Sequence, residues 1–446
     1  MRLIVLDSKA LTKLQSVALI AIIIGAALGG GVAYVLWIAS QPPPENIRIG
    51  ICADIDMRGG KATWRGAVLA AEQINAEGGI LGRNITIVAQ DDDSETQPDI
   101  AVASNAMTKL ITVDHADYII STGGSIITLP YQDICSEHKK IILTVATTTD
   151  NYTLRVIENY EKYKYSFRTC PANATTISEG LLGDIITVGN YTGFTKVALL
   201  FGESSSQRAK AADLKRTLPA HGFQIVYDKF FTEGTTDFAS YLAGIESAGA
   251  EIIVPYITGQ SGTSFVKEWY DRQSPTVIWG VLTLAGDSSF WNLTEGKCDT
   301  ISTNGYPTTS GYPLTNKTVP TREAYIRRWG EVPTMTAVGA YDTLRFILPD
   351  ALRRAGTTET EAVVEALENT DVETSCARHF VFTSSHDVLV GSGVPNNPAE
   401  DYMVMCIFQW QSGTQVPVKP EAIMKEAGVT FKYPNWRGPW SNFPTP

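Results

Sequence analysis

Apolar and polar positions in the first part of the chain alternate with two different periods. Residues 47–53 (IRIGICA) and 84–90 (NITIVAQ) alternate every second residue, which predicts strands. Between them, residues 64–79 place apolar side chains at helical spacing and end at a pair of glycines, as helices often do. The rhythm continues with predicted helices at 99–111 and 125–138 and predicted strands at 116–121 and 140–146. It predicts a parallel sheet covered by helices on both faces.

The same rhythm restarts further along the chain. The second set has predicted helices at 176–189, 207–222, 237–249 and 264–273 and predicted strands at 196–202, 223–231, 250–257 and 276–282. A helical block follows over 321–369, and two short β-like pieces lie at 379–384 and 402–410. We expect the tail after Gln411, rich in Pro and Trp, to wrap the surface. Two successive β/α halves predict an α/β fold with two Rossmann-like lobes.

The N-terminus differs from the rest of the chain. Residues 17–39 contain no charged side chain, and at about 1.5 Å per residue they reach about 35 Å, enough to span a bilayer. Because Arg2, Lys9 and Lys13 precede this run, we expect residues 1–16 in the cytoplasm. The expectation is a transmembrane signal anchor at 17–39, a linker at 40–46 and a single-pass protein of the cell membrane with its ectodomain outside. The alternative is a cleaved signal peptide.

Composition supports an external location and excludes one class of partner. The net charge is −11 and there is no Lys/Arg block, which argues against binding of nucleic acid. The chain has six N-x-[S/T] sequons, a pattern that is weak singly and favours a glycosylating exterior together, at Asn84, Asn151, Asn173, Asn190, Asn292 and Asn316. Its six cysteines form no CxxC motif, and the sequence does not say whether or how they pair.

Motifs for catalysis are absent from the sequence. There is no G-x-x-x-x-G-K-[ST], no G-x-G-x-x-G, no H-E-x-x-H and no G-x-S-x-G, and the five histidines are scattered. We therefore expect no catalytic residue, no metal, no cofactor and no enzyme activity. The acidic run Asp91, Asp92, Asp93 and Glu95 could hold a metal, act as paired carboxylates or face water. No glycine follows as in a Ca²⁺ loop, so we interpret it as a solvated loop before a helix that begins near Pro98.

Two loops carry a physical argument for a binding site. Residues 121–130 (STGGSIITLP) place two glycines and Ser125 between a strand end and a helix start, where free N–H groups bind anions. Residues 143–153 (LTVATTTDNYT) place a run of threonines beyond the carboxyl end of the next strand, where ligands of open α/β sheets bind. The alternative is that both are ordinary turns, which are rich in Gly and Thr.

These residues also match a family pattern. The stretch WRGAVLAAEQINAEGGILGRNITIVAQDDDSETQP orders a helix, a glycine turn, a strand and an acidic end, and YIISTGGSIITLPYQDI, KKIILTVATTT and VGAYDTLRF follow it. Over residues 47–410 the chain resembles the type I periplasmic binding proteins, specifically the branched-chain amino-acid (Leu/Ile/Val-type) substrate-binding components of ABC transporters. The resemblance implies two lobes joined by three crossovers. We expect lobe 1 at 47–167 plus 303–380 and lobe 2 at 168–302 plus 381–446.

The resemblance also implies a ligand site. The family positions that hold a ligand carboxylate fall on Ser125, Thr147 and Thr148, with Gly124 beside them. The chain departs from the family where a Glu pairs the ligand ammonium, because Leu282 and Thr283 stand there. Weaker candidates follow from that Glu position, from the family's aromatic positions and from the nearest acid: Met57, Ser206, Thr258, Thr283 and Asp287.

Three functions compete at this point. The first is an anchored solute-binding protein that closes on an amino acid or a similar small molecule and passes it to an ABC permease and its ATPase. An amide or urea-type ligand is the variant of this hypothesis. The second is a sensor ectodomain that reports the ligand without transport, and the third is an enzyme.

Overall fold

The computed structural model describes residues 45–94, 99–170, 173–232, 234–287, 289–391 and 401–442. The predicted membrane segment 17–39 and Glu95 lie outside these residues. No helix within the described ranges is long and apolar enough to cross a membrane. From Asn46 onward the chain forms one compact unit.

The first β/α half forms a five-stranded sheet in the order β2-β1-β3-β4-β5, and all its strands run parallel. Its elements are β1 (Ile47–Ala53), α2 (Arg58–Ala76), β2 (Ile85–Asp91), α3 (Ile100–Thr112), β3 (Tyr118–Ser121), α4 (Ser125–Glu137), β4 (Ile141–Thr144), α5 (Asn151–Glu158), α6 (Tyr160–Tyr163) and β5 (Ser166–Arg168). The predicted strands and longer helices are confirmed, and the three-residue β5 was missed because it is too short to show a period.

The second half forms a seven-stranded sheet in the order β14-β13-β10-β9-β8-β6-β7. Its elements are α7 (Ala174–Thr192), β6 (Lys196–Gly202), α8 (Ser205–Thr217), a 3₁₀ turn (Leu218–His221), β7 (Gln224–Phe231), α9 (Ala239–Ser247), β8 (Ile252–Ile257), α10 (Ser261–Asp271), β9 (Val277–Leu282), α11 (Phe290–Leu293) and β10 (Ser302–Gly305). Strands β6 to β10 are parallel, and β13 and β14 add an antiparallel hairpin at one edge.

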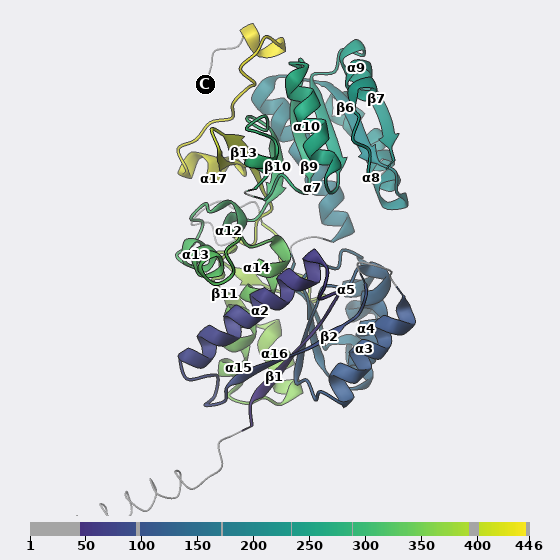
Figure 1. Cartoon of the computed structure of the whole chain (residues 1–446). Coiled ribbons are helices and arrows are strands. Elements are labelled where there is room, and N and C mark those ends of the chain that lie inside the picture. The colour runs from purple at the N-terminus through teal and green to yellow at the C-terminus, as the bar shows by residue number, and fades with distance from the viewer. Residues whose placement is uncertain are drawn as a thin grey trace, which may run out of the picture. The chain divides into compact units, whose positions relative to one another are not determined.

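The remaining elements return to the first sheet and then end beside the second. They are α12 (Pro307–Ser310), α13 (Thr318–Trp329), α14 (Met335–Asp342), a π-helical turn (Thr343–Ile347), α15 (Leu348–Ala355), α16 (Thr360–Glu368), β11 (Asp371–Val372), β12 (Phe380–Val381), β13 (Cys406–Gln411), β14 (Thr414–Lys419), α17 (Glu421–Glu426) and a 3₁₀ turn (Pro439–Asn442). Figure 1 shows α14, from late in the chain, beside α2, from its start.

Alternation along the strands gives the first sheet a core on each face. Ile49, Ile51 and Leu143 pack with α2, α14, α15 and α16 on one face, whereas Ile119 and Ile142 pack with α3 and α4 on the other. A parallel sheet buried on both faces needs apolar side chains at almost every strand position. The near-continuous apolar runs at 118–120 and 141–143 meet this need.

Three chain passages join the two sheets: from β5 to α7, from β10 to α12, and from Met403 to β13. The predicted lobe ranges remain a proposal, and the packing of the two sheets moves two of their boundaries. Strand β10 belongs to the seven-stranded sheet, while Phe380, Phe382 and Val388 pack in the core of the first sheet.

Two expectations about local structure were wrong. The tail after Gln411 does not merely wrap the surface, because β14 is a sheet strand and Phe431 and Trp440 are buried in the second core. The acidic run is not uniformly solvated either. Asp92 is buried, and its carboxylate accepts hydrogen bonds from the Tyr131 hydroxyl at 2.6 Å and the Ser94 amide at 3.0 Å.

One buried acid predicts a pH dependence of stability. Asp342 is 5% exposed at the end of α14, and burial raises its pKa to about 7, although the Ser375 amide donates to it at 3.1 Å. The unfolded chain has a pKa near 3.9 at this residue. The folded state therefore holds the proton more tightly, and this acid removes stability as pH rises from about 4 to about 7.

We expect Asp342→Asn to remove this dependence. Relative to the wild type, the variant should gain about 2.7 kcal/mol of free energy of unfolding between pH 5 and pH 8, because the two pH units between pH 5 and the folded pKa of about 7 each contribute about 1.36 kcal/mol. Urea unfolding of both proteins at the two pH values measures the difference. If the free energy of unfolding changes equally between the two pH values in both proteins, Asp342 does not cause the pH dependence.

Candidate functional site

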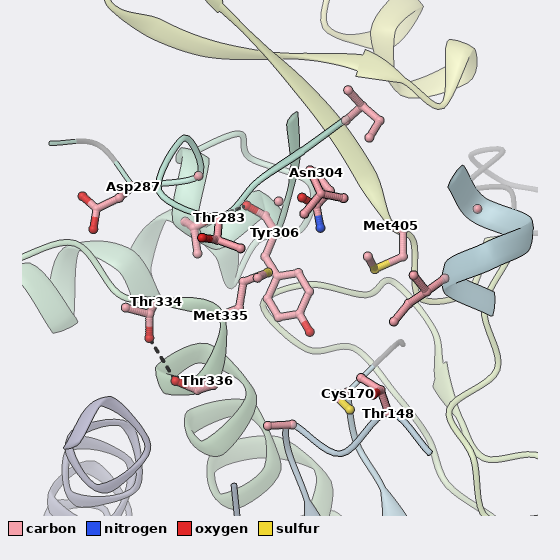
Figure 2. A pocket seen from close by; sticks show the side chains of 18 of the residues that line it. Thr148, Cys170, Thr283, Asp287, Asn304, Tyr306, Thr334, Met335, Thr336 and Met405 are labelled. Atoms are coloured by element: carbon pink, nitrogen blue, oxygen red, sulfur yellow. Dashed lines mark hydrogen bonds between the residues drawn. The ribbon is translucent and has the colours of Figure 1, made fainter. Parts of the chain in front are cut away.

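A cavity of about 530 Å³ lies where elements of the two sheets meet (Figure 2). Its walls come from the segment after β4, from α7, from the ends of β8, β9 and β10, and from the start of α14. Parallel strands bring their carboxyl ends to one edge, which is where ligands of α/β sheets bind. The volume is within the range of small-molecule sites.

Most of the cavity wall is apolar. The ring of Tyr306 crosses the middle of the view in Figure 2, with Met335 on one side of it and Met405 on the other. The other apolar lining residues include Val145, Ile177, Leu181, Tyr256, Val281 and Ile407. Burial raises the pKa of the Tyr306 hydroxyl well above its usual value, so this group stays a neutral hydrogen-bonding partner. The wall suits a ligand with an apolar body.

The threonine loop after β4 supplies hydroxyls at one side. Thr148 lines the cavity and is half-buried. Thr147 is fully buried, and its hydroxyl has no hydrogen-bond partner among the described residues. Each buried hydroxyl without a partner costs free energy, and such groups in native structures often mark a site.

Arg168 holds this loop in place. Its guanidinium donates to the carbonyl oxygens of Thr147 at 2.9 Å and Thr149 at 3.0 Å, and to the Thr153 hydroxyl at 3.1 Å. Its Nε lies 3.0 Å from a carboxylate oxygen of Asp387, and the arginine side chain is fully buried. Arginine's planar donors suit such a multiple contact, so this residue holds the backbone of the threonine loop.

The structure brings together only part of the predicted site. Thr148, Thr283 and Asp287 line the cavity. Gly124, Ser125, Thr147, Met57 and Thr258 are not among its described lining residues, and the side chain of Ser206 lies outside the description.

The two glycine-loop candidates have a clear local role. Gly124 is the N-cap of α4 and Ser125 is its first residue, so the free amides of that helix start beside them, as predicted. On the other wall, the Thr283 hydroxyl accepts a hydrogen bond from the Gly259 amide at 3.1 Å.

Four charged side chains line the cavity among the described residues, and they form two ion pairs. Arg58, the first residue of α2, pairs with Asp287 in the loop after β9. Lys419, at the end of β14, pairs with Asp184 in the middle of α7. Burial raises the pKa of Asp184, and Lys419 opposes that rise.

The second ion pair was missed from the sequence. Asp184 is the single acid within an otherwise apolar helical segment, LLGDIITVG, which is a signal that could have drawn attention. Lys419 had no such signal, because the strand that carries it was not predicted. The cavity also contains Cys170, one of six buried thiols. Within the described part of the chain, no group of three His, Cys, Asp or Glu side chains is placed to hold a metal.

Comparison with known proteins agrees with this architecture. A family model described as "Periplasmic binding protein" matches residues 55–394. The Leu/Ile/Val-binding protein homolog 3 of Brucella melitensis is 23% identical over 383 residues, which cover 82% of this chain and 92% of the relative. An amino acid binding protein of Pseudomonas aeruginosa is 30% identical over 195 residues, 44% of this chain and only 48% of that relative.

Solved structures show the same fold at low identity. The branched-chain amino acid transporter substrate-binding protein of Streptococcus pneumoniae, in complex with isoleucine, gives a TM-score of 0.64 at 20% identity, covering 84% of this chain and all of that one. A solute-binding protein of R. palustris, in complex with benzoate, gives 0.64 at 17% identity, covering 84% of this chain and 96% of that one. The two ligands share a carboxylate and an apolar body.

Proposed function

The chain belongs to the periplasmic binding protein family, in its Leu/Ile/Val-type branch of ABC-transporter substrate-binding proteins, and we propose that it captures a small polar ligand for import. This is a family of solute-binding proteins and not of enzymes. The observation that carries the proposal is the cavity of about 530 Å³ lined from both sheets, with a threonine loop at one side. Closure of the two halves around the ligand completes the site.

The ligand we propose is an amino acid or a related acid with an apolar body. Thr148 donates to its carboxylate, and Thr147, Gly124 and Ser125, which follow strands of the same half, are the other proposed contacts. The names of the relatives, which include amino acid and Leu/Ile/Val-binding proteins, support an amino acid. The apolar wall around Tyr306 supports the apolar body. An amide or urea-type ligand is the alternative.

The proposed partners are an ABC permease and its ATPase at the membrane. The uncharged segment 17–39 would hold the protein there, with the compact unit from Asn46 onward outside the cell. This location follows the usual arrangement of the family, in which the binding protein meets its ligand before the membrane. Detection of the ligand without transport would use the same cavity and a different partner.

A thermal-shift screen of residues 45–446 tests the ligand class. The panel contains apolar and polar amino acids, aromatic carboxylates, amides and urea. Ligands that bind only the folded state stabilise it and so raise the melting temperature. At a ligand concentration a hundredfold above Kd, the added free energy of unfolding is about 2.7 kcal/mol. We expect the largest shifts from apolar amino acids. The absence of a shift from every compound would reject the proposed function.

A further inference from the structure

An ion pair in the cavity wall is not explained by the threonine loop. Lys419 Nζ donates to Asp184 Oδ1, and the two side chains are only 22% and 15% exposed. Burial of charged groups costs free energy that their attraction offsets only in part. Apolar residues of similar size would fill this wall more favourably, as they do at Ile177, Leu181 and Ile407. The pair therefore calls for a role in binding.

The charges around the cavity cancel. Arg58 and Asp287 pair at the other wall, but Arg58 is 56% exposed, so water screens that pair strongly. The pair of Asp184 and Lys419 is thus the better buried of the two among the described lining residues. A ligand with a single negative charge would lose its hydration here without meeting an uncompensated cation.

The pair can still bind a suitable ligand group. An ammonium has three N–H donors and a carboxylate has two oxygens, and the contact between Lys419 and Asp184 uses one donor and one oxygen. A group that offers a donor and an acceptor side by side can therefore bond to both partners at once.

We infer that Asp184 and Lys419 are the specificity-determining residues of this cavity, selecting a head group of zero net charge that presents an N–H donor beside an oxygen acceptor. In an α-amino acid the ammonium faces Asp184 while Lys419 keeps the local charge balanced. The inference rests on the proposed function and adds to it the sign and balance of charge that the ligand must have. Asp184 would then be the acid that pairs with the ligand ammonium, a role that Leu282 and Thr283 cannot fill.

Titration calorimetry of residues 45–446 with three probes of one carbon skeleton tests the inference. The probes are L-leucine, which is a zwitterion, 4-methylpentanoate, which lacks the ammonium, and L-leucinamide, which is a cation at about pH 6. The wild type should prefer leucine to each of the other two by at least about tenfold.

The single variants should shift this preference in opposite directions. Asp184→Asn leaves Lys419 without this partner, so the affinity for 4-methylpentanoate should rise about tenfold relative to the affinity for leucine. Lys419→Gln leaves Asp184 without this partner, so the affinity for leucinamide should rise by a similar factor relative to the affinity for leucine. The double variant should lose both gains, because it restores zero charge.

A matched control removes a carboxylate from a pair outside the cavity. Glu246→Gln breaks a contact with Arg272 and should leave the order of the three probes unchanged. If leucine binds the wild type but neither single variant changes the order, the ion pair has only a structural role and the inference fails alone. If the wild type binds none of the three probes, the proposed amino-acid function fails and the inference with it. Should Asp184→Asn not fold, Lys419→Gln gives the same test with the opposite sign.

Discussion

Replacing Arg168 with methionine is expected to destabilise the protein by about 3–5 kcal/mol and to abolish ligand binding. The guanidinium is fully buried, and its loss leaves the carboxylate of Asp387 without that cation and the carbonyl oxygens of Thr147 and Thr149 without their donors. Methionine keeps much of the volume, so the cost comes from polar groups left unpaired rather than from a cavity. Chemical denaturation measures the first effect, and calorimetry measures the second.

A surface arginine provides the control for this variant. Arg272 pairs with Glu246 on a partly exposed face, and Arg272→Met should cost no more than about 1 kcal/mol and leave binding unchanged. If Arg168→Met is no more costly than Arg272→Met, the threonine loop does not depend on the buried guanidinium.

Removing the two hydroxyls of Ser125 and Thr148 together is expected to weaken ligand binding by more than about tenfold, which corresponds to about 1.4 kcal/mol. Both hydroxyls are proposed donors to the ligand carboxylate, and hydrogen bonds to a charged group contribute about 1.5–3 kcal/mol each. Neither side chain is fully buried, so Ser125→Ala with Thr148→Ala should leave the melting temperature almost unchanged. Calorimetry with the best compound of the screen measures the affinity.

The single variants separate the two contributions. Thr148 lines the cavity and Ser125 is not among its described lining residues, so Thr148→Ala should carry most of the loss. Thr112→Ala, at the exposed end of α3, is the control and should bind as the wild type does. Unchanged affinity in the double variant would show that the carboxylate binds elsewhere.

The fold could be predicted from the sequence wherever an element was long enough to show its period. The strands around Ile49, Ile119 and Ile142 lie between helices of both faces, and their apolar runs indicated this arrangement directly. Short or late elements escaped: β10 has four residues, and β14 follows a Ser412–Gly413 turn within a segment rich in Pro. The place of β10 in the sheet depends on pairing with β9 and with β13, which lies about a hundred residues later. The place of β14 depends on its hairpin with β13.

The residues of the site likewise divide into those with a local sequence signal and those that only the tertiary structure brings together. The threonines after β4 could be found because a strand end and a run of hydroxyls are both local signals. Arg168 and Asp387 could not be linked, since 219 positions separate their numbers and only the tertiary structure pairs them. The same holds for Asp184 and Lys419, which come from a helix and an edge strand of the second half. Buried charged pairs of this kind depend on long-range contacts that no local pattern indicates.

Whether a small ligand occupies this cavity is decided by titration calorimetry of residues 45–446 with the compound that gives the largest thermal shift. We expect one molecule bound per chain with a negative change in heat capacity, because apolar surface at Tyr306 and Met405 is buried. The variant Ala146→Trp, which fills the cavity from the threonine side, should show no binding heat while it still unfolds cooperatively. Binding of equal strength in the wild type and in Ala146→Trp, or no binding by the wild type, would contradict the assignment of this cavity as the ligand site.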